Sequence, residues 1–227
     1  MSAALSVVVQ SCPARKDLAE ALLSRLAGMS APGMDLLGIA WDETPGGGGP
    51  WGSGQRAWAM ASGERHLVIQ DDAIVCQDFL GAALMLSRLA PHAALTFCAF
   101  NGAVERARAA GKHWVRSGVG AYGQANLLKR EDALGFVPWE AGVPESERVR
   151  LKWNRSDDRR LSAYLKHLRV PILLPVPCLV QHDLVAPSLM GRPPKVGRYY
   201  REARWFIGDQ SPFSIDWSRG LDSPERG

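Results

Sequence analysis

The sequence predicts an α/β fold: a single domain in which a mostly parallel central sheet is flanked by helices. Three observations support this prediction. The chain has 227 residues, of which 46% are hydrophobic, and this is enough to bury a sizeable core. It opens with a strand, an amphipathic helix and a second strand, the order of a parallel βαβ unit. Further apolar runs alternate with helical patterns along most of the chain.

The first elements carry the clearest signals. Residues 5–10 form an apolar, valine-rich run that is typical of a strand. Leucines recur at helical spacing over 14–27, and Gly28 suits the end of that helix. The remaining signals predict strands at 34–41, 67–70, 94–100, 113–119, 171–176 and 178–181, helices at 55–62, 77–89, 124–134 and 154–168, a loop or short helix at 101–111, and a loop at 139–144.

Composition limits where the protein acts. No apolar run approaches the ~20 residues that span a membrane, and the first residues lack the basic region of a signal peptide. We therefore expect a soluble, cytoplasmic protein. The four cysteines lie far apart without a CxxC pair, which argues against a zinc site and for reduced core thiols. The net charge of +4 permits an anionic substrate such as a nucleotide without requiring nucleic acid.

Two segments lack a clear helix or strand pattern. Residues 44–54 are rich in glycine but lack the Lys-Ser/Thr of a phosphate-binding P-loop. They are either a flexible connector or a mobile loop beside a ligand. At the other end, we expect residues 1–210 to form the domain and residues 211–227 to form a loose polar tail.

The predicted strand at 67–70 ends at two adjacent carboxylates, Asp71 and Asp72. A strand tip is rigid and opens into a crevice, so an acidic pair at this position suits a metal site. Carboxylate oxygens favour Mg²⁺ or Mn²⁺, which share their coordination with water and substrate phosphates. The alternative is an Asp-Asp turn that caps the helix expected from residue 77.

Four stretches along the chain form a recognisable set. They are residues 9–15 after the first strand, 68–73 with 78–79 behind them, 156–158 at the start of a late helix, and 180–182. By these stretches the chain resembles bacterial or phage glycosyltransferases of the GT-A (Rossmann-like) fold, with distant similarity to lipopolysaccharide-type and collagen-galactosyltransferase-like enzymes. One departure is that a strict Asp-x-Asp is absent, because Gln70 stands at its first position.

The resemblance implies a metal-dependent transfer from a nucleotide-sugar donor, expected to be linked to UDP. Asp72 would bind Mn²⁺ or Mg²⁺ directly, and His182 would be a second ligand that closes over the donor diphosphate. Asp71 would bind the donor ribose or sugar, or the metal through water. Such an ion stabilises the charge that builds on the leaving diphosphate. Equally, His182 can be a hydrogen-bonded loop histidine at a strand end.

The acceptor hydroxyl must lose a proton, and Asp158 is the first candidate for the base, with Asp157 second. Acidic residues also occur in a first helical turn for helix-dipole reasons alone. If Asp158 is the base, an inverting single displacement follows. Nucleotide contacts are expected from the ends of the first two strands, namely Gln10, Ser11, Arg15 and Asp42, although Arg15 can also be a solvated helix charge.

A basic, aromatic stretch lies near the C-terminus, where Arg and Lys recur every third residue from Arg192 to Arg204. One or two of these charges, with Arg198 as the candidate, would clamp the donor diphosphate. Alternatively the row tracks a nucleic-acid backbone, with the aromatic residues as stacking surfaces. A solvated surface explains most of them equally well.

The leading hypothesis is therefore a nucleotide-sugar-dependent glycosyltransferase whose acceptor is a glycan or a modified phage DNA base. Two alternatives stay open. A non-catalytic nucleic-acid-binding α/β protein would bind with a steep salt dependence and would not need Asp72. A metal-dependent nucleotidyltransferase would also use paired carboxylates, but it would release pyrophosphate. The sequence leaves the sugar, the acceptor and the oligomeric state open.

Overall fold

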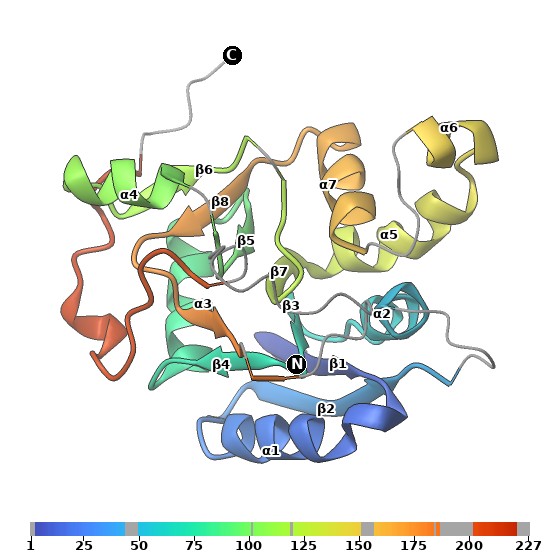
Figure 1. Ribbon diagram of the computed structural model, residues 1–227, viewed down its shortest axis with the longest axis horizontal. Helices are drawn as coiled ribbons and strands as arrows, with labels where there is room; N and C mark the ends of the chain where they lie inside the picture. The colour runs from blue at the N-terminus through green and yellow to red at the C-terminus, as the bar shows by residue number, and fades with distance from the viewer. Residues whose placement is uncertain are drawn as a thin grey trace.

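The computed structural model describes residues 3–43, 50–100, 102–118, 120–150, 157–183, 185–186 and 202–221. They form an α/β fold around a seven-stranded sheet, beside which lies a separate two-stranded sheet (Figure 1). The strands are β1 Leu5–Ser11, β2 Met34–Trp41, β3 Arg65–Gln70, β4 Ala73–Val75, β5 Ala94–Thr96, β6 Trp114–Arg116, β7 Ala125–Lys129, β8 Ile172–Pro175 and β9 Val180–His182. The helices are α1 Lys16–Ala27, α2 Pro50–Ala59, α3 Phe79–Leu89, α4 Gly102–Ala109, α5 Arg130–Ala141, α6 Glu145–Arg150 and α7 Asp157–His167, with 3₁₀ turns η1 Pro13–Arg15 and η2 Pro212–Ser214.

The large sheet has the strand order β2-β1-β3-β7-β5-β8-β6. β1 pairs in parallel with both β2 and β3, so the predicted βαβ unit at the N-terminus is confirmed. β5 and β8 are also parallel, whereas β7 and the edge strand β6 run against their neighbours. The sheet is therefore mixed, and its three neighbouring parallel strands, β2, β1 and β3, come from the N-terminal part of the chain.

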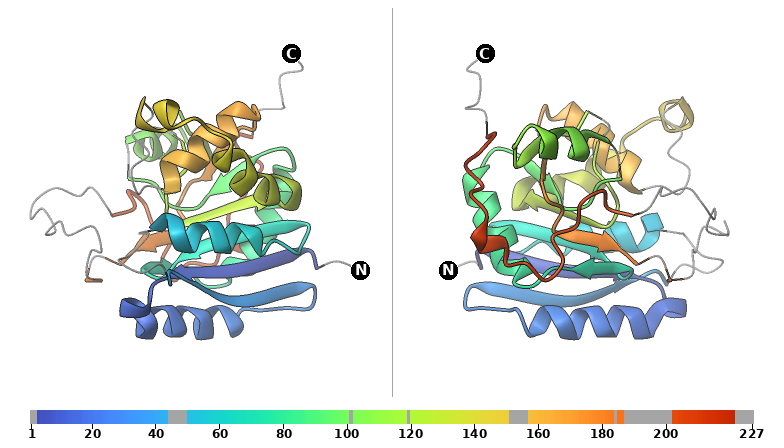
Figure 2. Two further views of the ribbon diagram at one scale, coloured as in Figure 1. Left: turned by 90° about the vertical axis from the view of Figure 1, so that its right-hand side faces the viewer. Right: turned by 60° about the vertical axis from the view of Figure 1, so that its left-hand side comes forward.

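Helices cover both faces of this sheet (Figures 1 and 2). Successive residues of β1 point to opposite faces, as the period of a strand requires. Val7 and Val9 pack in one core cluster with residues of α1, α3 and α4. Val8 packs in the other cluster with residues of α2, α5 and α7, among them Trp58 and Phe136. Because β1 is buried on both faces, it anchors the residues that follow it.

One predicted element is of the wrong type. Residues 124–134 were expected to be helical, but β7 covers Ala125–Lys129 and helix α5 begins only at Arg130. The segment is rich in Ala, Leu, Gln and Lys, which favour helices. It nevertheless pairs with β3 and β5 on its two sides, and these distant strands override the local preference.

Several boundaries also differ from the expected ones. Helix α2 begins at Pro50 and ends at Ala59, and residues 44–49 lie outside the described part of the chain. β5 ends at Thr96, and residues 139–141 belong to α5 instead of a loop. Three cysteines are buried thiols and Cys12 is a half-buried one. In the described ranges, every helix is too short or too polar to cross a bilayer.

The expectation of a loose tail from residue 211 is wrong for residues 211–221. Trp217 is 3% exposed and packs against Trp114, whose indole Nε1 donates to the Trp217 carbonyl at 2.6 Å. The Trp217 indole donates in turn to the Pro212 carbonyl at 2.7 Å. Burial of this large aromatic side chain ties the segment to the edge of the sheet. Residues 222–227 lie outside the described residues.

Candidate active site

The ends of the three parallel strands meet at one edge of the sheet. The Asp71 backbone N–H donates to the Gln10 carbonyl at 3.1 Å, which places the end of β3 beside the end of β1. The Asp42 N–H donates to the Ser11 carbonyl at 2.8 Å, so the end of β2 lies on the other side of β1. Parallel strands bring their carboxyl ends together, and this edge is where α/β sheets bind ligands.

Arg15 joins the two carboxylates of the acidic pair. Its Nη1 lies 2.7 Å from Asp71 Oδ1 and 2.8 Å from Asp72 Oδ2. The Ser11 hydroxyl donates to the other Asp71 oxygen at 2.5 Å. All four of these side chains are buried. Arg15 is therefore not a solvated helix charge, and its guanidinium supplies the positive charge between the two aspartates.

Burial and charge act in opposite directions on this cluster. Burial alone would lower the pKa of Arg15, but the charges and hydrogen bonds of Asp71 and Asp72 outweigh it and raise that pKa. Burial raises the pKa of Asp71, with Ser11 and Arg15 opposing it. For Asp72, burial is outweighed by His182 and Arg15, and its pKa is lowered. Asp72 is therefore the carboxylate that is held more firmly in its charged form.

His182 reaches this cluster through the small sheet. β9 pairs with β4 in antiparallel register, and His182 lies opposite Ala73, the residue after Asp72. Its Nε2 lies 3.3 Å from Asp72 Oδ2. The Asp183 N–H also donates to the Asp72 carbonyl at 2.7 Å. The structure thus brings together two residues that are 110 positions apart in the sequence.

Two buried polar atoms of this cluster, Asp72 Oδ1 and His182 Nδ1, have no hydrogen-bond partner among the described residues. The imidazole directs Nε2, and not Nδ1, at Asp72, so these two atoms do not face each other. Buried polar atoms without partners are costly, so a polar ligand at either atom would be stabilising. In the described part of the chain, however, no group of three or more His, Cys, Asp or Glu side chains is arranged to hold a metal. Any ion would therefore complete its coordination with substrate oxygens and water.

Gln10 links the acidic pair to the start of α7. Its carbonyl accepts from Asp71, and its side-chain amide donates to Asp157 Oδ2 at 2.9 Å. Burial, and next to it the charge of Asp158, raises the pKa of Asp157 to about 6. Asp158 Oδ1 accepts the Arg159 backbone N–H at 2.7 Å. Both aspartates lie in the first turn of α7 as expected, and Ser156 is outside the described residues.

The helix-capping alternative for Asp71 and Asp72 does not hold. β4 follows the pair directly, and helix α3 begins only at Phe79, after Asp78. The pair therefore lies at the turn between β3 and β4 and points its carboxylates at Arg15.

The remaining predicted contact residues pair with other side chains or lie outside the described residues. Asp42 is paired with Arg56 of α2, with 3.9 Å between Oδ1 and Nη2. Arg198 and most of the basic stretch are not described. Within that stretch, Arg204 contacts Glu105 at 3.6 Å and donates to the Phe100 carbonyl at 3.1 Å. Arg204 therefore ties the C-terminal segment to the body of the protein.

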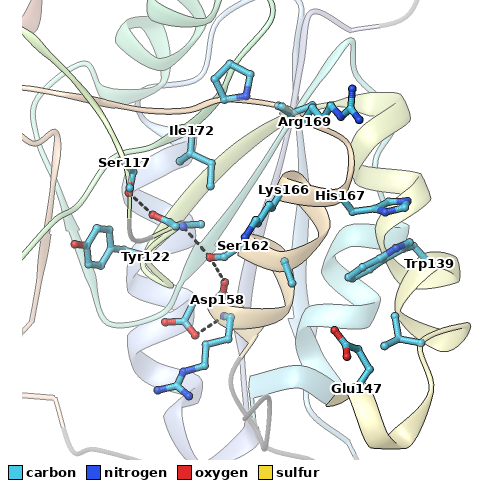
Figure 3. A pocket seen from close by; sticks show the side chains of 18 of the residues that line it. Ser117, Tyr122, Trp139, Glu147, Asp158, Ser162, Lys166, His167, Arg169 and Ile172 are labelled. Carbon is cyan, nitrogen blue, oxygen red and sulfur yellow. Dashed lines mark hydrogen bonds between the residues drawn. The ribbon is translucent and has the colours of Figure 1, made fainter. Parts of the chain in front are cut away.

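Sequence reasoning missed a large cavity beside Asp158. It has a volume of about 1570 Å³ and is lined by residues of α5, α6, α7 and the segments around β6 and β8 (Figure 3). Ser162 supports its wall, because its hydroxyl donates to the Asp158 carbonyl at 2.6 Å and accepts the Ala121 N–H at 2.9 Å. No local sequence pattern predicts that these residues line one cavity, because they come from separate parts of the chain.

The sequence matches no protein-family model and no curated protein. The candidate site consists of two connected parts: the buried Arg15–Asp71–Asp72–His182 cluster at the carboxyl ends of parallel strands, and the Asp157–Asp158 pair, which Gln10 connects to it.

Proposed function

We propose that the protein is a glycosyltransferase that moves a sugar from a nucleotide-sugar donor to an acceptor hydroxyl with the help of Mn²⁺ or Mg²⁺. The observation that carries this proposal is the meeting of His182 with Asp72, where each residue keeps one buried atom without a partner. The motifs that resemble GT-A glycosyltransferases supply these same residues, in the same order along the chain.

The topology supports the same fold family. The parallel strands β2-β1-β3 end at one edge of the sheet, the position at which α/β sheets commonly bind nucleotides. In the small sheet, pairing of β9 with β4 places His182 beside the acidic pair. Both features agree with a GT-A domain, which we propose as the fold. The resemblance favours a UDP-linked donor.

The reaction needs a base for the acceptor and stabilisation for the leaving group. The acceptor oxygen attacks the anomeric carbon of the sugar, while the bond from that carbon to the diphosphate oxygen breaks. The electron pair of that bond leaves with the nucleoside diphosphate. Asp158, beside Asp157, takes the acceptor proton. This single displacement inverts the configuration at the anomeric carbon.

Asp72 and His182 are the residues that would hold the divalent ion. When bound, such an ion supplies positive charge that stabilises the departing diphosphate. Arg15 keeps Asp72 ionised and fixes its orientation, so that one oxygen is committed to Arg15 and the other stays available. Ser11 orients Asp71 in the same way for the donor ribose or sugar. Burial of the four side chains strengthens these charge interactions.

Thermal unfolding in the presence of nucleoside diphosphates and nucleotide sugars, each with and without Mn²⁺, tests this function. A ligand that binds only the folded protein at ~100 times its Kd adds ~2.7 kcal/mol, which is about 5–10 °C for a chain of this size. We expect such a shift for one nucleotide and only with Mn²⁺. Asp72→Asn should abolish the shift, whereas the exposed Asp78→Asn should keep it. Metal-independent shifts, or an unaffected Asp72→Asn variant, would contradict the proposal.

A nucleic-acid-binding protein without catalytic activity is the second candidate, because cationic side chains line the large cavity. It predicts no response to any nucleotide sugar and no effect of Asp72→Asn on binding. A nucleotidyltransferase would be recognised by the release of pyrophosphate from a nucleoside triphosphate.

A further inference from the structure

The large cavity opens beside the candidate base. Asp158 lines this cavity and also lines a small pocket that Gln10 and Asp157 share. The Asp158 carboxylate therefore borders both the cavity and the small pocket beside Gln10, whose carbonyl accepts from Asp71. In Figure 3, Asp158, Ser162 and Lys166 follow one another along α7, with Arg169 at the far end. The volume of about 1570 Å³ exceeds the ~300–1,000 Å³ of a typical small-molecule pocket.

The walls of the cavity carry an excess of positive charge. Arg116, Lys166 and Arg169 line it, and all three side chains are exposed. Within the described ranges, none of the three takes part in an ion pair. By contrast, Arg150 on the rim is neutralised by Glu147, with Nε 2.7 Å from Oε2. The cavity thus presents unneutralised cations to a ligand.

Arg169 has a left-handed backbone conformation, which is usually occupied by glycine. α7 ends with the Val170 N–H donating to the Leu165 carbonyl at 2.9 Å, the 6→1 bond of a Schellman motif. Arg169 is the left-handed residue of this motif, with φ of 58°. Glycine adopts this conformation without strain. The backbone conformation therefore does not call for an arginine, although a cation at a helix C-terminus is favoured by the helix dipole.

Aromatic rings accompany these charges. Trp139 and Tyr122 line the cavity and are half-buried, so part of each side chain is accessible. The ring of His167 lies 5.7 Å from the ring of Trp139. Cations that contact a phosphate backbone, together with rings on which bases stack, are the combination that binds single-stranded nucleic acid. A neutral glycan would leave the cations without counter-charges.

We propose that this cavity is the acceptor site and that the acceptor is a single-stranded nucleic acid, which presents a hydroxyl to Asp158. Lys166, Arg169 and Arg116 bind its phosphates, and Trp139 or Tyr122 stacks on a base. This inference rests on the proposed transferase function, because a nucleic acid can be an acceptor only if the protein also binds a sugar donor.

Fluorescence anisotropy with a labelled single-stranded oligonucleotide tests it, at several salt concentrations. We expect wild-type affinity to fall as salt rises, with a slope of ~−0.7 for each phosphate contact. Lys166→Gln with Arg169→Gly should lower the affinity at least ~10-fold and reduce that slope by about 1–1.4. Arg169→Gly alone should keep or raise the melting temperature, so a loss of binding is not a loss of folding. Arg88→Gln on α3, an exposed arginine on the other face of the sheet, should change nothing.

Three results would overturn the inference: no binding by the wild-type protein, a loss no larger than that of Arg88→Gln, or binding of a phosphorylated oligosaccharide in place of the oligonucleotide. The nucleotide-sugar melting shift is measured on the same samples. If the cavity variants lose the oligonucleotide but keep the donor shift, the acceptor site is supported. If the wild-type protein binds the oligonucleotide but responds to no donor, the acceptor role and the transferase function fall together. A donor shift without oligonucleotide binding overturns the inference alone.

Discussion

Gln10 and Asp157 are joined by a hydrogen bond of 2.9 Å between side chains that are 147 positions apart in the chain. Gln10 is the last residue but one of β1, all of whose residues are buried, and Asp157 opens α7. The bond fixes the first turn of α7 against the edge where β1 and β3 end. Through it, the helix that carries the candidate base is connected to the strand end beside the acidic pair.

This bond also lowers the pKa of Asp157, because the amide donor favours the charged carboxylate. Gln10→Ala should therefore raise that pKa from its value of about 6. Carbon-detected NMR titration of the aspartate carboxyl groups measures it directly. Gln77→Ala, which changes an exposed glutamine, should leave the midpoint unchanged. A midpoint that stays in place or moves down in Gln10→Ala would show that the bond does not form.

Arg15 should be the most costly charged residue to remove. Arg15→Ala leaves two neighbouring buried carboxylates without a counter-charge, and breaking buried pairs of this kind costs about 3–5 kcal/mol. Urea unfolding at neutral pH measures the loss. Adding Asp71→Asn and Asp72→Asn to Arg15→Leu should recover part of it, because the penalty comes from uncompensated charge. If the triple variant is less stable than Arg15→Ala, the penalty has another origin.

His66 makes the protein sensitive to acid. Its ring is fully buried between the Ser6 hydroxyl and the Ala57 carbonyl, and burial lowers its pKa from 6.5 to about 4. The unfolded chain takes up a proton first as pH falls, so stability is lost between pH 6.5 and pH 4. The total loss is about 3 kcal/mol. Across this range, the free energy of unfolding should depend less steeply on pH in His66→Gln than in the wild-type protein. His92→Gln, which changes an exposed histidine, should show the same pH dependence of stability as the wild-type protein. If His66→Gln also shows the wild-type pH dependence, His66 is not the source of the acid sensitivity.

Gly120 is required where the loop before β7 crosses α7. A Cβ at this position would overlap the Ser162 side chain, and φ is +102°. Gly120→Ala should destabilise the protein by about 2 kcal/mol or more, from strain and from loss of the Ser162 bridge to Asp158 and Ala121. Thermal unfolding of Gly120→Ala with and without Ser162→Gly separates the two causes. The second substitution removes the overlap but not the strained φ, so recovery should be partial. Full stability in Gly120→Ala alone would be inconsistent with this packing.

The strand-end chemistry could be predicted from the sequence because its signals are local. An apolar run followed by Asp71 and Asp72 predicts both the strand and the position at which it ends. The parallel order of β1, β2 and β3 then follows from the βαβ rule, and with it the meeting of Ser11, Asp42 and Asp71 at one edge.

Long-range pairing explains what could not be predicted. β7 has helix-forming residues and becomes a strand only because β3 and β5 flank it. Trp217 becomes buried only through Trp114, which lies 103 positions away. The role of Arg15 as the shared partner of two aspartates depends on an approach over 56 residues. Side chains whose environment is set by distant segments leave no periodic pattern in the sequence.

The release of nucleoside diphosphate tests the central claim most directly. The nucleotide sugar that shifts the melting temperature is incubated with Mn²⁺ and an acceptor oligonucleotide or glycan, and the nucleoside diphosphate formed is measured. We expect release that depends on Mn²⁺, falls at least ~100-fold in Asp72→Asn, and persists in Asp78→Asn. Release that is equal in Asp72→Asn and wild type, or pyrophosphate from a nucleoside triphosphate as the product, would contradict the assignment of a glycosyltransferase.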